Sequence, residues 1–539
     1  MDLDKLLEEC RLEQEKLAWD GTFSEYLGMV IKNPHMVRLS HARVYDMLVA
    51  NGVEVNNLGE RQYKLFSGEV YGLERPLARL VDYFSSAAGR LEVRKRMLLL
   101  LGPPSTGKST IVNILKKGLE EYTKTDGGAL YAIGGCPMQE EPLHLIPERL
   151  RPDFEKEYGI YIEGDLCHHC RYLLRDKYHG RVQDVEVERM VLSEREGIGI
   201  GTYVATDPES QDISRLVGTV DNSIVGKDRV ETAGKAYRLD GELNVASRGI
   251  MDFIEMFKCN ERFLTALVTV TQEQTIKMGR FGTVYADEVI IAHSNEADYR
   301  EFVENRHTEA LQDRIVMVKI PYNLRVSEEV RIYEKLLRGT EAERVHFAPL
   351  ATKLASMVAV LSRLDPPSKG GMSMMEKLAL YDGRYVSGFT RKDVEDMQNK
   401  AHNEGLTGIS PRYVVNRLSA LSADPDVKCV GPLMVLEALA DGLEQHIPLY
   451  EKVTQPVDGQ PRPARSRLTG LTAQEEYRER LQTIFSETRK EYSILARKEL
   501  QQAFVGAVES EAQKAFDSYV GHVEAYLDNT RVVDAESVA

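Results

Sequence analysis

Apolar residues recur at helical spacing along most of the chain, and a few short apolar runs interrupt them. Residues 3–19 and 23–32 carry leucine and methionine every three or four positions, which predicts two helices near the N-terminus. The runs MLLLLG (97–102), IIAHSN (290–295) and IVMVKIPY (315–322) have the length and composition of buried strands. Because helical segments alternate with these runs, we predict an α/β fold whose parallel sheet is covered by helices on both faces.

The pattern changes along the chain in a way that predicts several structural units, as expected for 539 residues. The predicted units are a helical N-terminal leader at 1–70, an α/β domain at 71–330, a helical lid at 331–422 and a helical C-terminal region at 423–539. A proline- and glycine-bearing stretch at 454–470 is typical of a linker within the last unit.

The balance of charge is acidic, with 84 aspartates and glutamates against 69 lysines and arginines and a net charge of −15. Binding to nucleic acid depends on lysine and arginine at phosphates, so this balance argues against a nucleic-acid partner and favours a protein or nucleotide partner. No apolar run approaches the ~20 residues that span a bilayer, and the N-terminus lacks the features of a secretory signal. We therefore expect no membrane partner, a cytoplasmic location and reduced cysteines.

One segment matches the G-x-x-x-x-G-K-[ST] pattern of a phosphate-binding loop, with an apolar strand before it and a predicted helix after it. Its glycines let backbone N–H groups turn toward phosphates, Lys108 is placed to reach the β- and γ-phosphates, and the Ser109 hydroxyl is a ligand for Mg²⁺. We expect ATP to contact Gly102, Pro103, Pro104, Ser105, Thr106, Gly107, Lys108, Ser109 and Thr110. The segment predicts binding of ATP with magnesium.

ATP hydrolysis also needs groups that polarise and orient the attacking water. The segment GIMDFIEMFK supplies a short strand followed by Glu255, while Ile254 stands where a first, metal-binding acid is usual. We expect Glu255 to polarise the water and Asn295, after the next strand, to orient it. The alternatives are that Glu255 and Asp252 are surface acids and that Asn295 only forms a turn.

Two arginines and a short segment before the loop complete the predicted nucleotide site. Arg314 is a candidate arginine finger for a neighbouring subunit, and Arg412 is a candidate sensor of the γ-phosphate from the lid. Each arginine has the alternative of an ordinary surface ion pair, worth about 0–1 kcal/mol. Tyr71 and Gly72 are placed to contact adenine through the backbone.

A group of cysteines and histidines lies in a predicted insertion near 130–190. Cys167 and Cys170 form a C-x-x-C pair, and Cys136 and His144 precede them. Together the four residues form a candidate Cys₃His zinc site. Two alternatives stay open: reduced cysteines at the start of a helix, and a redox pair.

Several longer segments resemble the PrkA family of bacterial and archaeal proteins, which are described as serine protein kinases. The resemblance spreads from about residue 74 to 420, through EYGIYIEGDL, QDISRLVG, DGELNVASRGIMDFIEMFK, LVTVTQE, IIAHSNEADY, ALQDRIVMVKIPYNLRVSEEVRIYEKLL and GISPRYVVNRLS. It implies an AAA+ ATPase core with a helical lid, and a homo-oligomer.

The resemblance also implies roles for particular residues. Residues 102–110 correspond to the Walker A segment, Glu255 to the Walker B acid, Asn295 to sensor 1, Arg314 to the finger and Arg412 to sensor 2. The family's kinase-like segment lies at the C-terminus, and we expect this chain to stop early in or before it.

Three functions are compatible with these observations. The resemblance implies an ATPase that acts on a protein partner as a serine protein kinase, although the chain carries neither an HRD nor a DFG motif of ordinary kinases. The alternatives are an ATP-driven remodeller or ATP-dependent protease without kinase activity, and a nucleotide-gated scaffold.

Overall fold

The computed structural model describes most of the chain. Described are residues 4–5, 8, 11–12 and 15, and 17–527 except 57–58, 206–210, 221–236, 278–282, 306–307, 341–343, 368–370, 402 and 444–472. The predicted linker at 454–470 and much of the predicted first helix therefore lie outside the described residues. Across the part that is described, no helix is both long and apolar enough to cross a membrane.

Five parallel strands form the central sheet, in the order β14-β4-β13-β10-β7. The strands are β4 (Met97–Leu101), β7 (Ile200–Val204), β10 (Ile250–Ile254), β13 (Val289–Ser294) and β14 (Ile315–Lys319). The apolar runs that predict strands correspond to β4, β13 and β14. Because all five strands are parallel, their carboxyl ends share one edge of the sheet.

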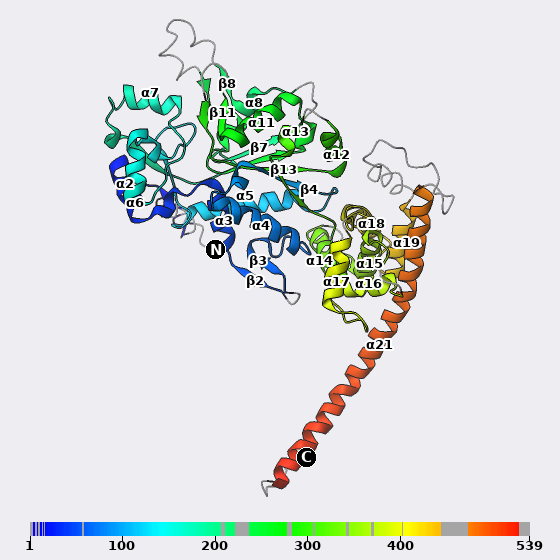
Figure 1. Ribbon diagram of the computed structural model, residues 1–539. Helices are drawn as coiled ribbons and strands as arrows, with labels where there is room; N and C mark the ends of the chain where they lie inside the picture. The colour runs from blue at the N-terminus through cyan, green and yellow to red at the C-terminus, as the bar shows by residue number, and fades with distance from the viewer. Residues whose placement is uncertain are drawn as a thin grey trace.

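Helices cover both faces of this sheet, as predicted (Figure 1). The alternation along β4 shows it directly: Leu98 and Leu100 belong to one buried cluster, and Met97, Leu99 and Leu101 to another. On the first face lie α3 (Ser40–Ala50), α4 (Glu74–Ala88) and α5 (Lys108–Lys124). On the second lie α8 (Ser214–Val217), α10 (Glu242–Val245) and α11 (Glu261–Glu273).

The N-terminal segment, predicted as a helical leader, contains short strands as well as helices. Helix α2 (Phe23–Lys32) has the predicted bounds and begins with a capping box between Thr22 and Glu25. Just before it, β1 (Asp20–Thr22) pairs with β6 (Glu186–Met190), which also pairs with β5 (Leu130–Ile133). The leader is thereby joined to the insertion, whose helices are α6 (Arg151–Tyr158) and α7 (His168–Asp176).

The chain after β14 is almost entirely helical. Its helices are α14 (Val326–Leu337), α15 (Ala351–Arg363), α16 (Met374–Tyr381), α17 (Arg391–Lys400), α18 (Pro411–Ser422) and α19 (Pro432–Asp441). Helix α15 is buried along nearly its whole length and forms the centre of this bundle. A short parallel pairing of β15 (His346–Phe347) with β16 (Cys429–Val430) departs from the wholly helical prediction.

The last described element is one long helix, α21 (Ala473–Leu527), of 55 residues. Its first turns pack against α15 and α19, where Tyr477, Leu481 and Ile484 are buried. Beyond this contact the helix extends away from the rest of the molecule (Figure 1).

A fully buried ion pair fixes the start of the helical bundle. The Arg363 guanidinium lies 2.6 Å from the Glu329 carboxylate, and both side chains are 0% exposed. Arg363 also donates to the carbonyls of Asn323 (2.8 Å) and Ile409 (2.9 Å). The guanidinium thereby links α14, α15, the segment before α14 and the segment before α18.

Replacing Arg363 by methionine should lower the free energy of unfolding by about 3–5 kcal/mol, because it leaves the Glu329 carboxylate buried without a cation. Urea unfolding followed by circular dichroism would measure the loss. The double variant Arg363→Met/Glu329→Leu should recover much of it, and Arg331→Met at an exposed position of α14 should change little. If Arg363→Met lowers the free energy of unfolding no more than Arg331→Met does, the proposed contribution of the Arg363–Glu329 pair to stability is wrong.

Candidate nucleotide-binding site

The predicted phosphate-binding loop connects β4 to α5 at the carboxyl edge of the sheet. Within it, Ser105 and Gly107 have positive φ angles of 66° and 89°. A side chain at Gly102 is excluded, since its Cβ would lie 2.0 Å from the carbonyl oxygen of Ile320 in the segment after β14. The loop is therefore tightly shaped, and its amide groups lie at the N-terminus of a 17-residue helix, where partial positive charge favours anions.

The Lys108 side chain folds back over this loop. Its Nζ donates to the carbonyls of Gly102 (2.6 Å) and Pro103 (2.7 Å). Burial lowers the pKa of Lys108 to about 8, while the nearby Glu255 carboxylate acts in the opposite direction. A cationic group is thus held inside the loop, with bonds that it can exchange for phosphate oxygens.

Glu255 and Asn295 follow neighbouring strands and lie at the same edge of the sheet as the loop. Hydrogen bonds fix this alignment: the Glu255 amide donates to His293 (3.0 Å), and the Gly102 amide donates to Ser294 (3.4 Å). Glu255 has a left-handed backbone with φ 55°, which costs a residue with a side chain about 1–3 kcal/mol. The structure places Lys108, Glu255 and Asn295 after the carboxyl ends of three neighbouring strands, while their roles in hydrolysis stay predictions.

Asp252 lies outside this group, within β10. It is buried against Lys116 of α5, at 2.7 Å, and its carboxylate is 3.3 Å from His293. Burial raises the pKa of Asp252, but the bonds to His293 and Lys116 outweigh burial and hold the pKa below its usual value. The alternative of a surface acid does not hold for Asp252, because its role is to neutralise a buried lysine between α5 and the sheet.

Arg314 lies at the amino ends of the strands, on the side of the sheet opposite the loop. It immediately precedes β14, and its carbonyl accepts a hydrogen bond (2.9 Å) from the amide of Met97, the first residue of β4. Its side chain borders an open cavity of about 460 Å³ together with Glu92 and Lys95. Arg314 is therefore distant from the phosphate-binding loop of its own chain.

Arg412 belongs to the bundle and is linked to the loop by Tyr322, which lies near both. The Tyr322 hydroxyl donates to the Pro104 carbonyl (3.0 Å), and the Arg363 guanidinium lies 4.8 Å from its ring. Burial raises the pKa of Tyr322 to about 12, and the charges of Arg363 and Arg412 oppose that rise. Arg412 lies in the first turn of α18 with an exposed side chain, and no ion pair holds it among the described residues.

Gly72 packs against the segment that joins β14 to α14, and Arg331 of α14 lies over the Tyr71 ring. Gly72 has φ 72°, and a Cβ there would lie 2.3 Å from the side chain of Asn323. The Tyr71 hydroxyl donates to Gly68 (2.8 Å). Gly72 borders a cavity of about 490 Å³ between the sheet and the bundle, while contact of either residue with adenine stays a prediction.

Comparison with known proteins assigns the family. The PrkA AAA domain matches residues 21–371, and the PrkA serine protein kinase C-terminal domain matches residues 375–537. The chain belongs to the PrkA family. The expectation that the chain stops before the C-terminal kinase segment is wrong, because residues 375–537 match that domain.

Relatives of this PrkA-family chain carry different names. The ATP-dependent protease PrkA of Bacillus subtilis (strain 168) is 46% identical over 99% of this chain and 81% of its own length. The serine/threonine kinase YeaG of Escherichia coli (strain K12) is 28% identical over 99% of this chain and 78% of its own. Among solved structures, NtrX from Brucella abortus in complex with ATP has a TM-score of 0.33 and 12% identity, covering 79% of this chain and 64% of that one.

Two residues near the PrkA-family site were missed by the sequence analysis. Lys258 forms an ion pair with Glu255, and Asp298 hydrogen-bonds to Asn295, which caps α12 (Glu296–Glu304). Burial raises the pKa of Asp298, with Lys258 opposing and Glu255 adding to the rise. The Asn-x-x-Asp spacing of a helix start would have identified Asp298 from sequence.

The cysteine cluster of the insertion forms, but with a different fourth member. Cys136, Cys167 and Cys170 come together with Glu140. His144 is not among the groups whose ligand atoms lie within 4.8 Å of one another. Its Nε2 lies 2.8 Å from the Glu163 carbonyl, and its ring packs edge-on against Tyr285. The predicted Cys₃His set is therefore wrong in its histidine.

ATP affinity should decline as pH rises above about 8. Lys108, with a pKa of about 8, is charged at neutral pH and loses its proton above that value, so the attraction for phosphate weakens by up to about tenfold per pH unit. Titration with a fluorescent ATP analogue between pH 6.5 and 9.5 would measure the change. Lys108→Met should bind more weakly with a flat profile, and a flat wild-type profile would contradict the prediction.

Proposed function

We propose that this PrkA-family protein binds ATP with magnesium at residues 102–110 and hydrolyses it to act on a protein partner. The observation that carries the proposal is the convergence of Lys108, Glu255 and Asn295 at one edge of the sheet. Three groups with complementary chemistry there come from three neighbouring strand ends. The net charge of −15 favours a protein over a nucleic acid as the partner.

Each group has a distinct part in hydrolysis. Lys108 and the amides at the start of α5 stabilise negative charge on the phosphates. Glu255 accepts a proton from the attacking water, and Asn295 orients that water through its side-chain amide. Ser109, exposed in the first turn of α5, would hold magnesium, which would supply positive charge to neutralise the phosphates. Ile254 offers no ligand for this ion.

We also propose that the functional form is a homo-oligomer. The position of Arg314 supports this, since it lies at the sheet edge opposite its own phosphate-binding loop and borders an open cavity. In a head-to-tail assembly that edge faces the site of the next subunit. Arg412 would close the same site from the bundle within one chain.

Mixing two inactive variants tests this arrangement. Arg314→Ala and Lys108→Ala should each have little turnover alone, because the first lacks the finger and the second lacks the loop lysine. An equimolar mixture, exchanged and reassembled, should regain up to about a quarter of wild-type turnover at sites that pair an intact loop with an intact finger. No recovery in mixtures shown to contain mixed oligomers would contradict action between subunits.

Serine phosphorylation is the second candidate activity, supported by the match of residues 375–537 to the PrkA serine protein kinase C-terminal domain. Incubation with γ-labelled ATP and a serine-rich acceptor, with free phosphate and labelled protein measured separately, distinguishes the two. Label on the acceptor that is lost with Lys108→Ala would support a kinase that uses this loop. Free phosphate without labelled acceptor would support an ATPase that remodels a partner or delivers it to proteolysis. Absence of both products would contradict the proposal.

A further inference from the structure

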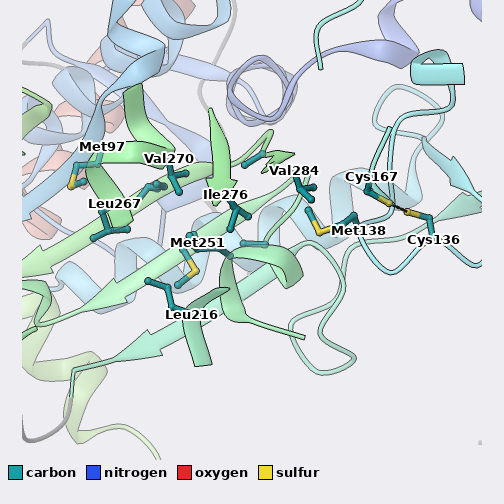
Figure 2. Close-up of a cluster of buried hydrophobic side chains, with 14 of the residues drawn as sticks. Met97, Cys136, Met138, Cys167, Leu216, Met251, Leu267, Val270, Ile276 and Val284 are labelled. Atoms are coloured by element: carbon teal, nitrogen blue, oxygen red, sulfur yellow. Dashed lines mark hydrogen bonds between the residues drawn. The ribbon is translucent and has the colours of Figure 1, made fainter. Parts of the chain in front are cut away.

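Four buried groups converge in the insertion, outside the phosphate-binding loop. Cys136 and Glu140 lie in the turn after β5, while Cys167 caps α7 and Cys170 lies in its first turn. Their sulfur and carboxylate atoms all lie within 4.8 Å of one another, and all four residues are buried. Figure 2 shows Cys136 and Cys167 with their side chains directed toward each other.

The spacing of these atoms fits one tetrahedral ion. The Cys136 and Cys167 sulfurs are 4.0 Å apart, and the Cys136 sulfur lies 3.7 Å from Glu140 Oε2. Zinc bound by sulfur at ~2.3 Å and by carboxylate oxygen at ~2.1 Å places such pairs about 3.8 and 3.6 Å apart. A disulfide would need the sulfurs at about 2.05 Å, and these cysteines are free.

The charge of the cluster also calls for a cation. Glu140 is only 4% exposed, and among the described residues no lysine or arginine pairs with it. The neighbouring Arg248 pairs with Glu141 instead. A buried carboxylate surrounded by three thiols is costly unless it is protonated or a positive ion compensates it.

The surrounding backbone holds the donors in place. The Cys167 amide donates to Glu140 Oε1 (2.6 Å), which leaves Oε2 toward Cys136. The Cys170 amide points to the Cys167 sulfur at 3.4 Å, an arrangement that favours a thiolate at the start of a helix. Such hydrogen bonds to ligands are typical of metal sites in proteins.

We propose that Cys136, Glu140, Cys167 and Cys170 bind one Zn²⁺ ion in a closed structural site. Four protein ligands complete a tetrahedron and leave no position for a substrate. The ion joins the turn after β5 to the start of α7, and so fixes the helical part of the insertion onto the sheet β1-β6-β5. This inference is independent of the activity at the phosphate-binding loop.

Elemental analysis of the full-length protein, purified in reducing buffer without added metal, tests the site. About one equivalent of zinc per chain is expected, with iron far below that. Cobalt exchanged into the protein should give the visible bands of a tetrahedral site and a thiolate charge-transfer band. Zinc near zero, iron in its place, or octahedral cobalt spectra would overturn the proposal.

Variants test each ligand. Cys167→Ser should lose zinc, while Cys429→Ser, at an exposed cysteine of β16, should keep it. Glu140→Ala should release zinc to a chromogenic chelator more than about tenfold faster than wild type, and Glu140→Cys should release it more slowly. Full retention by Cys167→Ser, or unchanged release from Glu140→Ala, would overturn the assignment.

One measurement needs no variant and so does not depend on how the variants fold. Titration of the wild-type protein with an organomercurial should release zinc in step with reaction of the three clustered thiols. Zinc released by chelator without any change in thiol reactivity would overturn ligation by these cysteines.

Discussion

Glu255→Gln should leave ATP bound but slow its hydrolysis by about 10²–10⁴-fold, the contribution of a positioned general base. Glutamine has the size of glutamate, so the left-handed backbone at this position should persist. The hydrogen bond from its backbone amide to the His293 carbonyl should persist as well. The variant loses only the carboxylate that would accept the proton of the attacking water. Its ion pair with Lys258 is half-exposed and contributes little to stability.

Single-turnover hydrolysis and equilibrium binding of ATP, measured on the same preparation, check this prediction. Glu301→Gln, the same change at an exposed position of α12, is the matched control and should behave as wild type. Normal turnover by Glu255→Gln would show that another group activates water, and Asp298 beside Asn295 would be the next residue to test.

Lys108→Ala should reduce kcat/KM for ATP by about 10²–10³-fold or more, as loss of one preorganised charged donor does at other sites of developing negative charge. The loss should appear in binding as well as in turnover, because the ammonium group contacts phosphates in both the ground state and the transition state. The fold should remain, since removing Lys108 leaves only the carbonyls of Gly102 and Pro103 to be solvated.

Isothermal titration with ATP and a phosphate-release assay would separate the two effects. Lys117→Ala, an exposed lysine of the same helix, is the control for loss of general positive charge. Equal affinities for wild type and Lys108→Ala would place the phosphates elsewhere and would remove the basis of the proposed function.

The sheet could be predicted from sequence where a strand consists mostly of apolar residues, as in β4, β10, β13 and β14. Strands β4, β13 and β14 have such runs, and β4 and β13 are buried along their whole length. Strand β7 has no such run, because its sequence IGTYV contains Gly201. The Glu242 carbonyl oxygen packs so closely on Gly201 that a Cβ there would lie only 2.4 Å from it. That close packing depends on α10, so the local sequence of β7 does not predict it. The pairing of β1 with β6 joins residues that are far apart in the sequence, such as Asp20 and Glu188, so local periodicity cannot reveal it either.

The candidate sites likewise contain residues that the sequence could predict and one that it could not. Strand order brings Lys108, Glu255 and Asn295 together, and each follows a strand that sequence could identify. The fourth group of the cysteine cluster could not be found, because it depends on a tight turn. Gln139 adopts φ 49°, and its backbone amide donates a hydrogen bond to the Cys136 carbonyl (3.0 Å). This turn places Glu140 beside the sulfurs and directs the chain with His144 away from them.

The length of α21 gives small motions a long reach. At 1.5 Å per residue its 55 residues span about 80 Å. Its side chains pack against the bundle as far as Leu495, and the residues after Leu495 extend about 48 Å further. A tilt of about 10° where this contact ends would move the distal tip through roughly 8 Å, so a small rearrangement in the bundle would displace a partner bound at the tip much farther.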